Sequence, residues 1–225
     1  MANAALVGLN FQGGDTFNLA TGTIAGSTAG TAIVAQQNWN NALNVNNNLG
    51  TIANLISSTG SSSGIAASFI GPDSWKASGT GVVGPSGNEQ MSYGFIKANG
   101  GNLTIPSGNV TVTFSGFTSG SGFDMVIYTA SDNGGVGNTF ALNDTLNTSV
   151  SYSVGSGNVA TFTENTTKHM FTNLTAVGSS VTLTMSGDGA GLAGVQFSPI
   201  PEPSSAVLIG LGALGLLSRR TRRRA

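Results

Sequence analysis

NVTVTFSGF, residues 109–117, alternates large apolar residues with threonine. Successive side chains of an extended strand point to opposite faces, so the two valines and the first phenylalanine would share one face and the threonines the other. Residues 180–186, SVTLTMS, repeat this alternation. One apolar face and one hydroxyl face are typical of a strand in an antiparallel sheet that packs on a core with one side only. Both segments are therefore predicted to be strands of such a sheet.

Short β-prone runs occur on both sides of this stretch. They are residues 5–12, 64–70, 91–98, 102–106, 123–130, 139–143, 149–154, 158–163, 169–174 and 193–198. Nearly every gap after residue 90 contains Gly, Asn, Asp or Ser, which are the residues of tight turns. Closely spaced short strands of this kind predict an all-β fold, an antiparallel β-sandwich, and no segment looks long enough for the helix of a βαβ unit.

The region between the first two runs has a weaker pattern. Residues 18–32 are small and polar, which predicts a loop with at most a short strand. Residues 32–56 are rich in asparagine, which disfavours a long helix. We interpret this segment as irregular, with Trp39 as an anchor that packs on the core.

The charge of the chain excludes several classes of function. Charged residues make up 8% of the sequence, against about 25% in an ordinary soluble domain. Residues 1–200 contain three lysines and eight acidic residues, a formal charge of −5. A nucleic-acid-binding surface needs clustered Lys and Arg, so no nucleic-acid partner is expected. The absence of cysteine excludes a disulfide scaffold and a thiol enzyme.

The C-terminal residues 199–225 have a different composition from the rest. Pro201, Glu202 and Pro203 precede the apolar run 206–217, AVLIGLGALGLL. An arginine cluster follows at once, formed by Arg219, Arg220, Arg222, Arg223 and Arg224. The apolar part is shorter than the ~20 residues of an ordinary membrane helix, but arginine side chains snorkel and extend its reach. We predict a single short transmembrane helix at about 204–218 with the arginines on the cytoplasmic side; the alternative is a buried C-terminal helix with a basic end.

These three parts, in this order and at close spacing, resemble the PEP-CTERM sorting signal of exported bacterial proteins. The resemblance implies recognition by an exosortase, a membrane transpeptidase-like enzyme that cuts near the Pro-Glu-Pro motif. The protein would be anchored in the membrane through its C-terminus before processing and would then reach the cell surface or the extracellular space. Residues 1–4 contain Ala2-Asn3-Ala4, the A-x-A form of a signal-peptidase site, and are interpreted as the remnant of a signal peptide.

The order of motifs in the body resembles a domain of planctomycete and verrucomicrobial PEP-CTERM proteins. The shared motifs are VGLNFQGG at 7–14, NWNN at 38–41, STGSSSGIAASF at 58–69, GFDMVIYTA at 122–130 and GLAGVQF at 191–197. The resemblance implies a jelly-roll-like sandwich similar to carbohydrate-binding domains. The expected organisation is therefore a β-sandwich ectodomain over residues 5–198 and a sorting segment over 199–225, with the basic tail at 219–224.

Catalytic motifs are sparse. His169 is the single histidine, and we interpret it as a residue at a strand edge because no second histidine accompanies it. Asp124 lies among apolar residues, but alternation with its neighbours places it on the solvated face. Glu89 and Glu164 are the glutamates of the body, and a glycan hydrolase would need two carboxyl groups facing each other across a cleft. We expect a protein that is not an enzyme. A glycan-active hydrolase is the less favoured alternative.

Two kinds of binding residue remain. Asp132, Asp144 and Asp188 lie in turn-like segments; we interpret them first as plain turn residues, with calcium ligands as the alternative, and no other cofactor is expected. Trp39 and Trp75 could stack on a sugar ring, or both could belong to the core. The sequence thus predicts an exported surface or matrix protein, with an exosortase and the membrane as partners. A lectin-like module that binds extracellular polysaccharide is the alternative.

Overall fold

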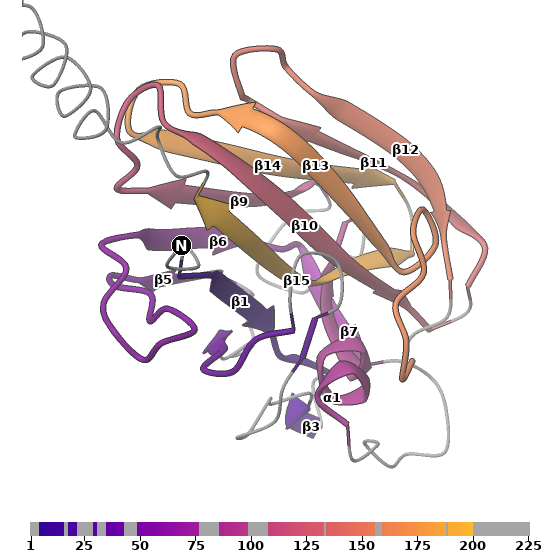
Figure 1. Cartoon of the computed structure of the whole chain (residues 1–225). Helices are drawn as coiled ribbons and strands as arrows, with labels where there is room; N and C mark the ends of the chain where they lie inside the picture. The colour runs from indigo at the N-terminus through magenta and orange to yellow at the C-terminus, as the bar shows by residue number, and fades with distance from the viewer. Residues whose placement is uncertain are drawn as a thin grey trace, which may run out of the picture.

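The computed structural model describes residues 5–15, 18–21, 29–30, 35–42, 49–76, 86–98, 108–132, 134–155, 159–187 and 189–199. Most of this part of the chain is β-strand, and it forms two large sheets that pack face to face (Figure 1). The prediction of an all-β sandwich is confirmed. Of the C-terminal segment 199–225 only Pro199 is described, so the predicted membrane helix, the Pro-Glu-Pro motif and the arginines lie outside the described residues, as do residues 1–4.

The first sheet has seven strands. Its main path is β13 (Lys168–Thr175), β10 (Gly122–Ser131), β15 (Ala190–Pro199), β1 (Val7–Phe11) and β4 (Asn40–Ala42). β8 (Gly94–Lys97) also pairs with β15, and β7 (Asp73–Lys76) pairs with β8. Every pair is antiparallel except β1 and β4, which are parallel. The chain between β1 and β4 is long enough for the crossover that a parallel pair requires.

The second sheet has six strands. In order they are β12 (Ser149–Val154), β11 (Val136–Leu142), β14 (Ser180–Gly187), β9 (Val110–Ser115), β6 (Ala66–Ile70) and β5 (Leu49–Ile52). All of these pairs are antiparallel. A third, two-stranded sheet joins β2 (Gly13–Asp15) to β3 (Asn18–Thr21).

The main core lies between the two large sheets. In β9 and β14 every second residue is buried, as the alternation of the sequence predicts. Phe114 of β9 meets Phe197 of β15 edge to face, with ring centroids 5.1 Å apart, and Phe11 meets Phe69 in the same way at 5.2 Å. On the opposite face of β9 and β14, the Thr113 and Thr182 hydroxyls lie 3.0 Å apart. The antiparallel ladder therefore separates an apolar inner face from a hydroxyl outer face.

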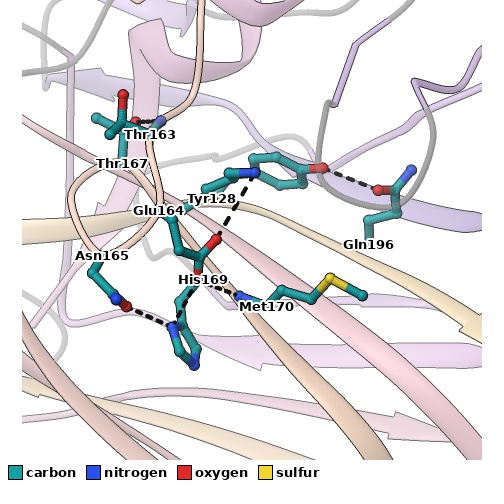
Figure 2. Close-up of polar contacts among 9 residues, drawn as sticks. Tyr128, Thr163, Glu164, Asn165, Thr167, His169, Met170 and Gln196 are labelled. Carbon is teal, nitrogen blue, oxygen red and sulfur yellow. Dashed lines mark hydrogen bonds and ion pairs between the residues drawn. The ribbon is translucent and has the colours of Figure 1, made fainter.

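A second, smaller core covers the outer face of the seven-stranded sheet. Tyr128 of β10 lies there against Trp39 and Phe162, with ring centroids 5.9 and 4.7 Å away. The Tyr128 hydroxyl donates to Gln196 Oε1 at 3.0 Å (Figure 2), and Gln196 Nε2 donates to Gln36 Oε1 at 2.8 Å. Because both faces of this sheet are covered, β10 is a nearly continuous run of buried residues.

Two of the predicted strands are wrong, and residues 32–56, which were expected to be irregular, contain the strands β4 and β5. Residues 91–98 were expected to be one strand, but they begin inside the helix α1 (Gly87–Tyr93), and only Gly94–Lys97 forms β8. The helix starts at a capping box: Glu89 N–H donates to Ser86 Oγ at 3.2 Å, and Ser86 N–H donates to Glu89 Oε2 at 3.0 Å. The Ser86 hydroxyl also donates to Glu89 Oε2 at 2.6 Å, and this bond, together with the one from Ser86 N–H, lowers the pKa of the Glu89 carboxyl.

The second error concerns residues 158–163, which were expected to be a strand. The described residues 159–163 are irregular, and they carry Phe162 into the second core. Other predicted strands are close to the observed ones: β1 falls within 5–12 and β6 within 64–70. The predicted strand 102–106 lies outside the described residues. Nowhere in the described part of the chain is there a helix with the length and apolar character that crossing a membrane requires.

Candidate functional site

A pocket of about 400 Å³ lies at one end of the sandwich, and we call it the terminal pocket. Its apolar wall includes three rings: Phe117 lies 5.1 Å from Phe123 and 5.6 Å from Phe197, measured between centroids. Serine and threonine residues of the segments 57–63 and 118–121 line the rest. The volume is within the usual range for a site that binds a small molecule, roughly 300–1,000 Å³.

The loops around the terminal pocket are held by backbone hydrogen bonds. Ser57 N–H donates to the Ser61 carbonyl at 2.8 Å, and Gly60 N–H donates to the Ser57 carbonyl at 2.8 Å. Gly116 has a φ of +103°, and a Cβ added there would lie 2.2 Å from the carbonyl oxygen of Gly64. A glycine at 116 is required because the loops at 64 and 116 touch through their backbones. The pocket is therefore built into the fold.

The described lining of the terminal pocket carries no charged side chain. None of the described residues that line it is acidic, basic or a histidine. Asp124, which is next to the lining residue Phe123, instead accepts a hydrogen bond from Asn173 N–H at 2.8 Å and is half-buried. The described lining thus offers aromatic surface and hydroxyl groups, and no pair of carboxylates that could act as acid and base.

The two tryptophans lie elsewhere in the structure. Trp39 is 7% exposed, and its indole N–H donates to the Gln36 carbonyl at 3.1 Å. Trp75 is half-buried in β7, with the Lys97 ammonium 5.2 Å from the ring centroid. Neither lines the terminal pocket. The structure places Trp39 in the second core and leaves Trp75 partly accessible beside a cation.

The candidate calcium ligands are not seen as a cluster. Asp144 is 3% exposed and accepts from Thr148 N–H at 2.7 Å and from the Thr148 hydroxyl at 2.9 Å. It thereby closes the turn between β11 and β12. Asp132 directly follows β10, and Asp188 lies outside the described residues. Among the described residues, no three acidic or histidine side chains come close enough together to hold a metal ion.

His169 and Glu164 meet in a turn that leads into the edge strand β13 (Figure 2). The His169 Nδ1 atom lies 2.7 Å from Asn165 Oδ1 and 3.0 Å from Glu164 Oε1. Both partners are acceptors, so Nδ1 carries the proton. Glu164 also accepts from Met170 N–H at 3.0 Å and lies 3.8 Å from Lys168 Nζ. The contacts of the Glu164 carboxylate thus hold this turn in place. His169 lies on an edge strand, as expected.

The stability of this turn should depend on pH. Burial lowers the pKa of the His169 imidazole below its usual value, although the nearby Glu164 carboxylate opposes this shift. The unfolded imidazole titrates near pH ~6.5. Below that pH the unfolded chain therefore binds more protons than the folded one, and the free energy of unfolding falls until the folded pKa is passed. Above the pKa of the unfolded imidazole, the contribution of His169 to the free energy of unfolding is constant.

We predict that His169→Gln reduces the loss of Tm between pH 8 and pH 5, as measured by differential scanning calorimetry. Thr172→Gln, at an exposed position of the same strand, is the matched control and should keep the wild-type slope. An unchanged slope in His169→Gln would contradict the assignment of this titration to His169.

A third feature is the outer face of the six-stranded sheet, which carries many hydroxyl groups. The Thr139 and Ser151 hydroxyls lie 2.7 Å apart there, within a shallow hollow of about 390 Å³ over β11, β12 and β14. This hollow is lined mainly by serine, threonine and glycine. It offers hydrogen bonds but little apolar surface to bury, so the terminal pocket is the stronger candidate site.

Sequence reasoning did not find the terminal pocket. Its residues come from segments far apart in the chain, from Ala5 to Pro199. The available signals were the serine run at 61–63 and an aromatic residue, Phe117, placed just after a strand. Neither signal indicates that these segments lie side by side in the folded chain.

The geometry defines a class of protein: a two-sheet β-sandwich whose last strand, β15, ends at Pro199, where the C-terminal segment begins. Residues 199–224 match the family model of the PEP-CTERM protein-sorting motif. The chain thus carries a PEP-CTERM sorting signal, as the sequence predicts. No curated protein matches the chain.

Several solved structures are distantly similar. The CBM36-1 domain of a multidomain xylanase from the hindgut metagenome of Trinervitermes trinervoides is 13% identical, with a TM-score of 0.32, over 56% of this chain and 93% of that one. A carbohydrate-binding module CBM36 in complex with calcium and xylotriose is 18% identical, with a TM-score of 0.26, over 43% and 83%. TmCBM61 in complex with β-1,4-galactotriose is 13% identical, with a TM-score of 0.31, over 62% and 90%. Likenesses this distant carry no information about what this chain binds.

Proposed function

We propose that this chain is an exported, non-catalytic β-sandwich protein that an exosortase processes and delivers to the cell surface or the extracellular matrix. The observation that carries the proposal is the position of the sorting motif. It begins at Pro199, the last residue of β15, and β15 pairs with β10, β1 and β8 within the first sheet. Every described strand of the sandwich ends at or before Pro199, so cleavage near Pro203 would leave the described strand pairing intact.

The parts of the signal have separate roles in this proposal. The prolines Pro201 and Pro203 remove backbone donors and disfavour helix at the residue before each of them. They keep the Pro-Glu-Pro motif extended and accessible to the enzyme. Residues 204–218 hold the precursor in the membrane, and the five arginines keep its end in the cytoplasm.

The test is the mass of the protein recovered from the cell surface, the medium and the cytosol of its native host. We expect a mature chain that ends close to Pro203 and lacks the arginines. As a matched control, Glu202→Ala should leave an uncleaved chain in the membrane fraction. A full-length wild-type chain that still carries SRRTRRR and is found in the cytosol would overturn the proposal.

A lectin-like sandwich is the alternative that a specific observation favours. The terminal pocket combines aromatic rings with hydroxyl groups and has no charged residue among its described lining. This combination suits the neutral envelope or matrix polysaccharide that an exported protein would meet. A hydrolase has less support, because the described lining of this pocket supplies no carboxylate.

A further inference from the structure

The terminal pocket has one ring that is more accessible than the others. Phe123 and Phe197 are each 1% exposed, whereas Phe117, two residues beyond the end of β9, is only half-buried. The core thus holds two rings in place, and the third presents part of its surface to the pocket. A sugar ring has apolar C–H groups on its faces, and these pack well on an aromatic ring.

The polar side-chain groups on the rim of the terminal pocket are serine and threonine hydroxyls. Some hydroxyls are used within the loop: Ser62 Oγ donates to Asn54 Oδ1 at 2.7 Å, and Ser63 Oγ donates to the Leu55 carbonyl at 2.7 Å. Thr118 and Ser121 also line the pocket. A hydroxyl group both donates and accepts, so it can pair with a sugar hydroxyl in either direction.

The absence of charge from the described lining selects among ligands. An anionic sugar would enter a pocket with no Lys, Arg or His among its described residues, and its charge would lose hydration without gaining a partner. A neutral sugar loses only hydrogen bonds to water, which the rim replaces. The volume of about 400 Å³ suits one or two sugar residues.

We infer that the terminal pocket binds a neutral sugar residue of a polysaccharide, with one face of the sugar packed on Phe117 and its hydroxyl groups bonded to the serine and threonine rim. This inference rests on the lectin-like form of the proposed function, and it names the site and the chemical class of the ligand. Neither tryptophan takes part.

The test is affinity electrophoresis of the full chain in mild detergent. The probes are soluble xylan, galactan, mannan and mixed-linkage β-glucan, the neutral exopolysaccharide of the producing cells, and alginate as an anionic polymer. We expect at least one neutral polymer to retard the protein and alginate to have no effect. Phe117→Ala should weaken that binding about tenfold, and Phe117→Tyr should retain it.

Two further variants separate binding from folding. Thr118→Val changes an exposed rim residue and should weaken binding without lowering Tm. Leu146→Ala truncates an apolar side chain that is 77% exposed and does not line the pocket, so it should bind like the wild type. Retardation by none of the neutral polymers, retardation by alginate, or unchanged affinity in both Phe117→Ala and Thr118→Val would overturn the inference. The cleavage of the sorting signal is measured separately by mass, so failure of one proposal does not imply failure of the other.

Discussion

Replacing Gly191 with alanine is expected to lower the free energy of unfolding by about 3 kcal/mol, the upper part of the range for overpacked cores. Gly191 is buried in β15, and a Cβ added there would lie 2.0 Å from Phe95 Cδ2. Phe95 is fully buried in the second core, so its ring cannot move aside without displacing its neighbours. Urea denaturation followed by circular dichroism would measure the loss.

Two comparisons make this expectation specific. Gly137→Ala adds the same methyl group in β11, where no atom lies within 4 Å of the new Cβ, and it should change stability little. Phe95→Leu removes the obstructing ring, so the double variant Gly191→Ala, Phe95→Leu should lose less than the sum of the two single changes. A Gly191→Ala protein as stable as Gly137→Ala would show that the close contact with Phe95 is wrong.

Replacing Gln196 with leucine is expected to cost about 3 kcal/mol. The side chain of Gln196 is fully buried and joins the Tyr128 hydroxyl to the Gln36 amide. Leucine has a similar size but leaves both partners buried without this bond, at about 1–3 kcal/mol for each group. Thermal and urea unfolding would measure the loss.

A matched variant separates hydrogen bonding from packing. Tyr128→Phe removes the hydroxyl that loses its hydrogen bond to Gln196 in Gln196→Leu, so adding it to Gln196→Leu should recover part of the stability. If the double variant is less stable than Gln196→Leu alone, the cost arises from packing and the account of the hydrogen bond is wrong.

The main core could be predicted from local sequence. Val110, Val112 and Phe114 alternate with threonine, and the structure buries them on one face of β9. The alternation is sufficient because the direction of a side chain in a strand depends only on its position along that strand. The sorting signal was readable for the same reason, since all its elements lie within residues 199–224.

The errors of prediction also have physical causes. Helix α1 was missed because residues 91–98 resemble a strand in composition, although the capping pair Ser86 and Glu89 was a readable signal. The irregular segment at 159–163 was mistaken for a strand because its apolar residues cover the second core without pairing. Phe162 packs on Tyr128 there, and neither residue indicates the other in the sequence.

Local alternation and the order of the C-terminal residues were enough to specify a sandwich that carries a sorting signal. The second core and the terminal pocket depend on which distant segments meet. The hydrogen bond between Gln36 and Gln196 spans 160 residues, and the terminal pocket brings Ala5 and Pro199 to one end of the sandwich. Such contacts follow from the pairing order and register of the strands, which arise from the packing of the whole chain and leave no periodic pattern in any one segment.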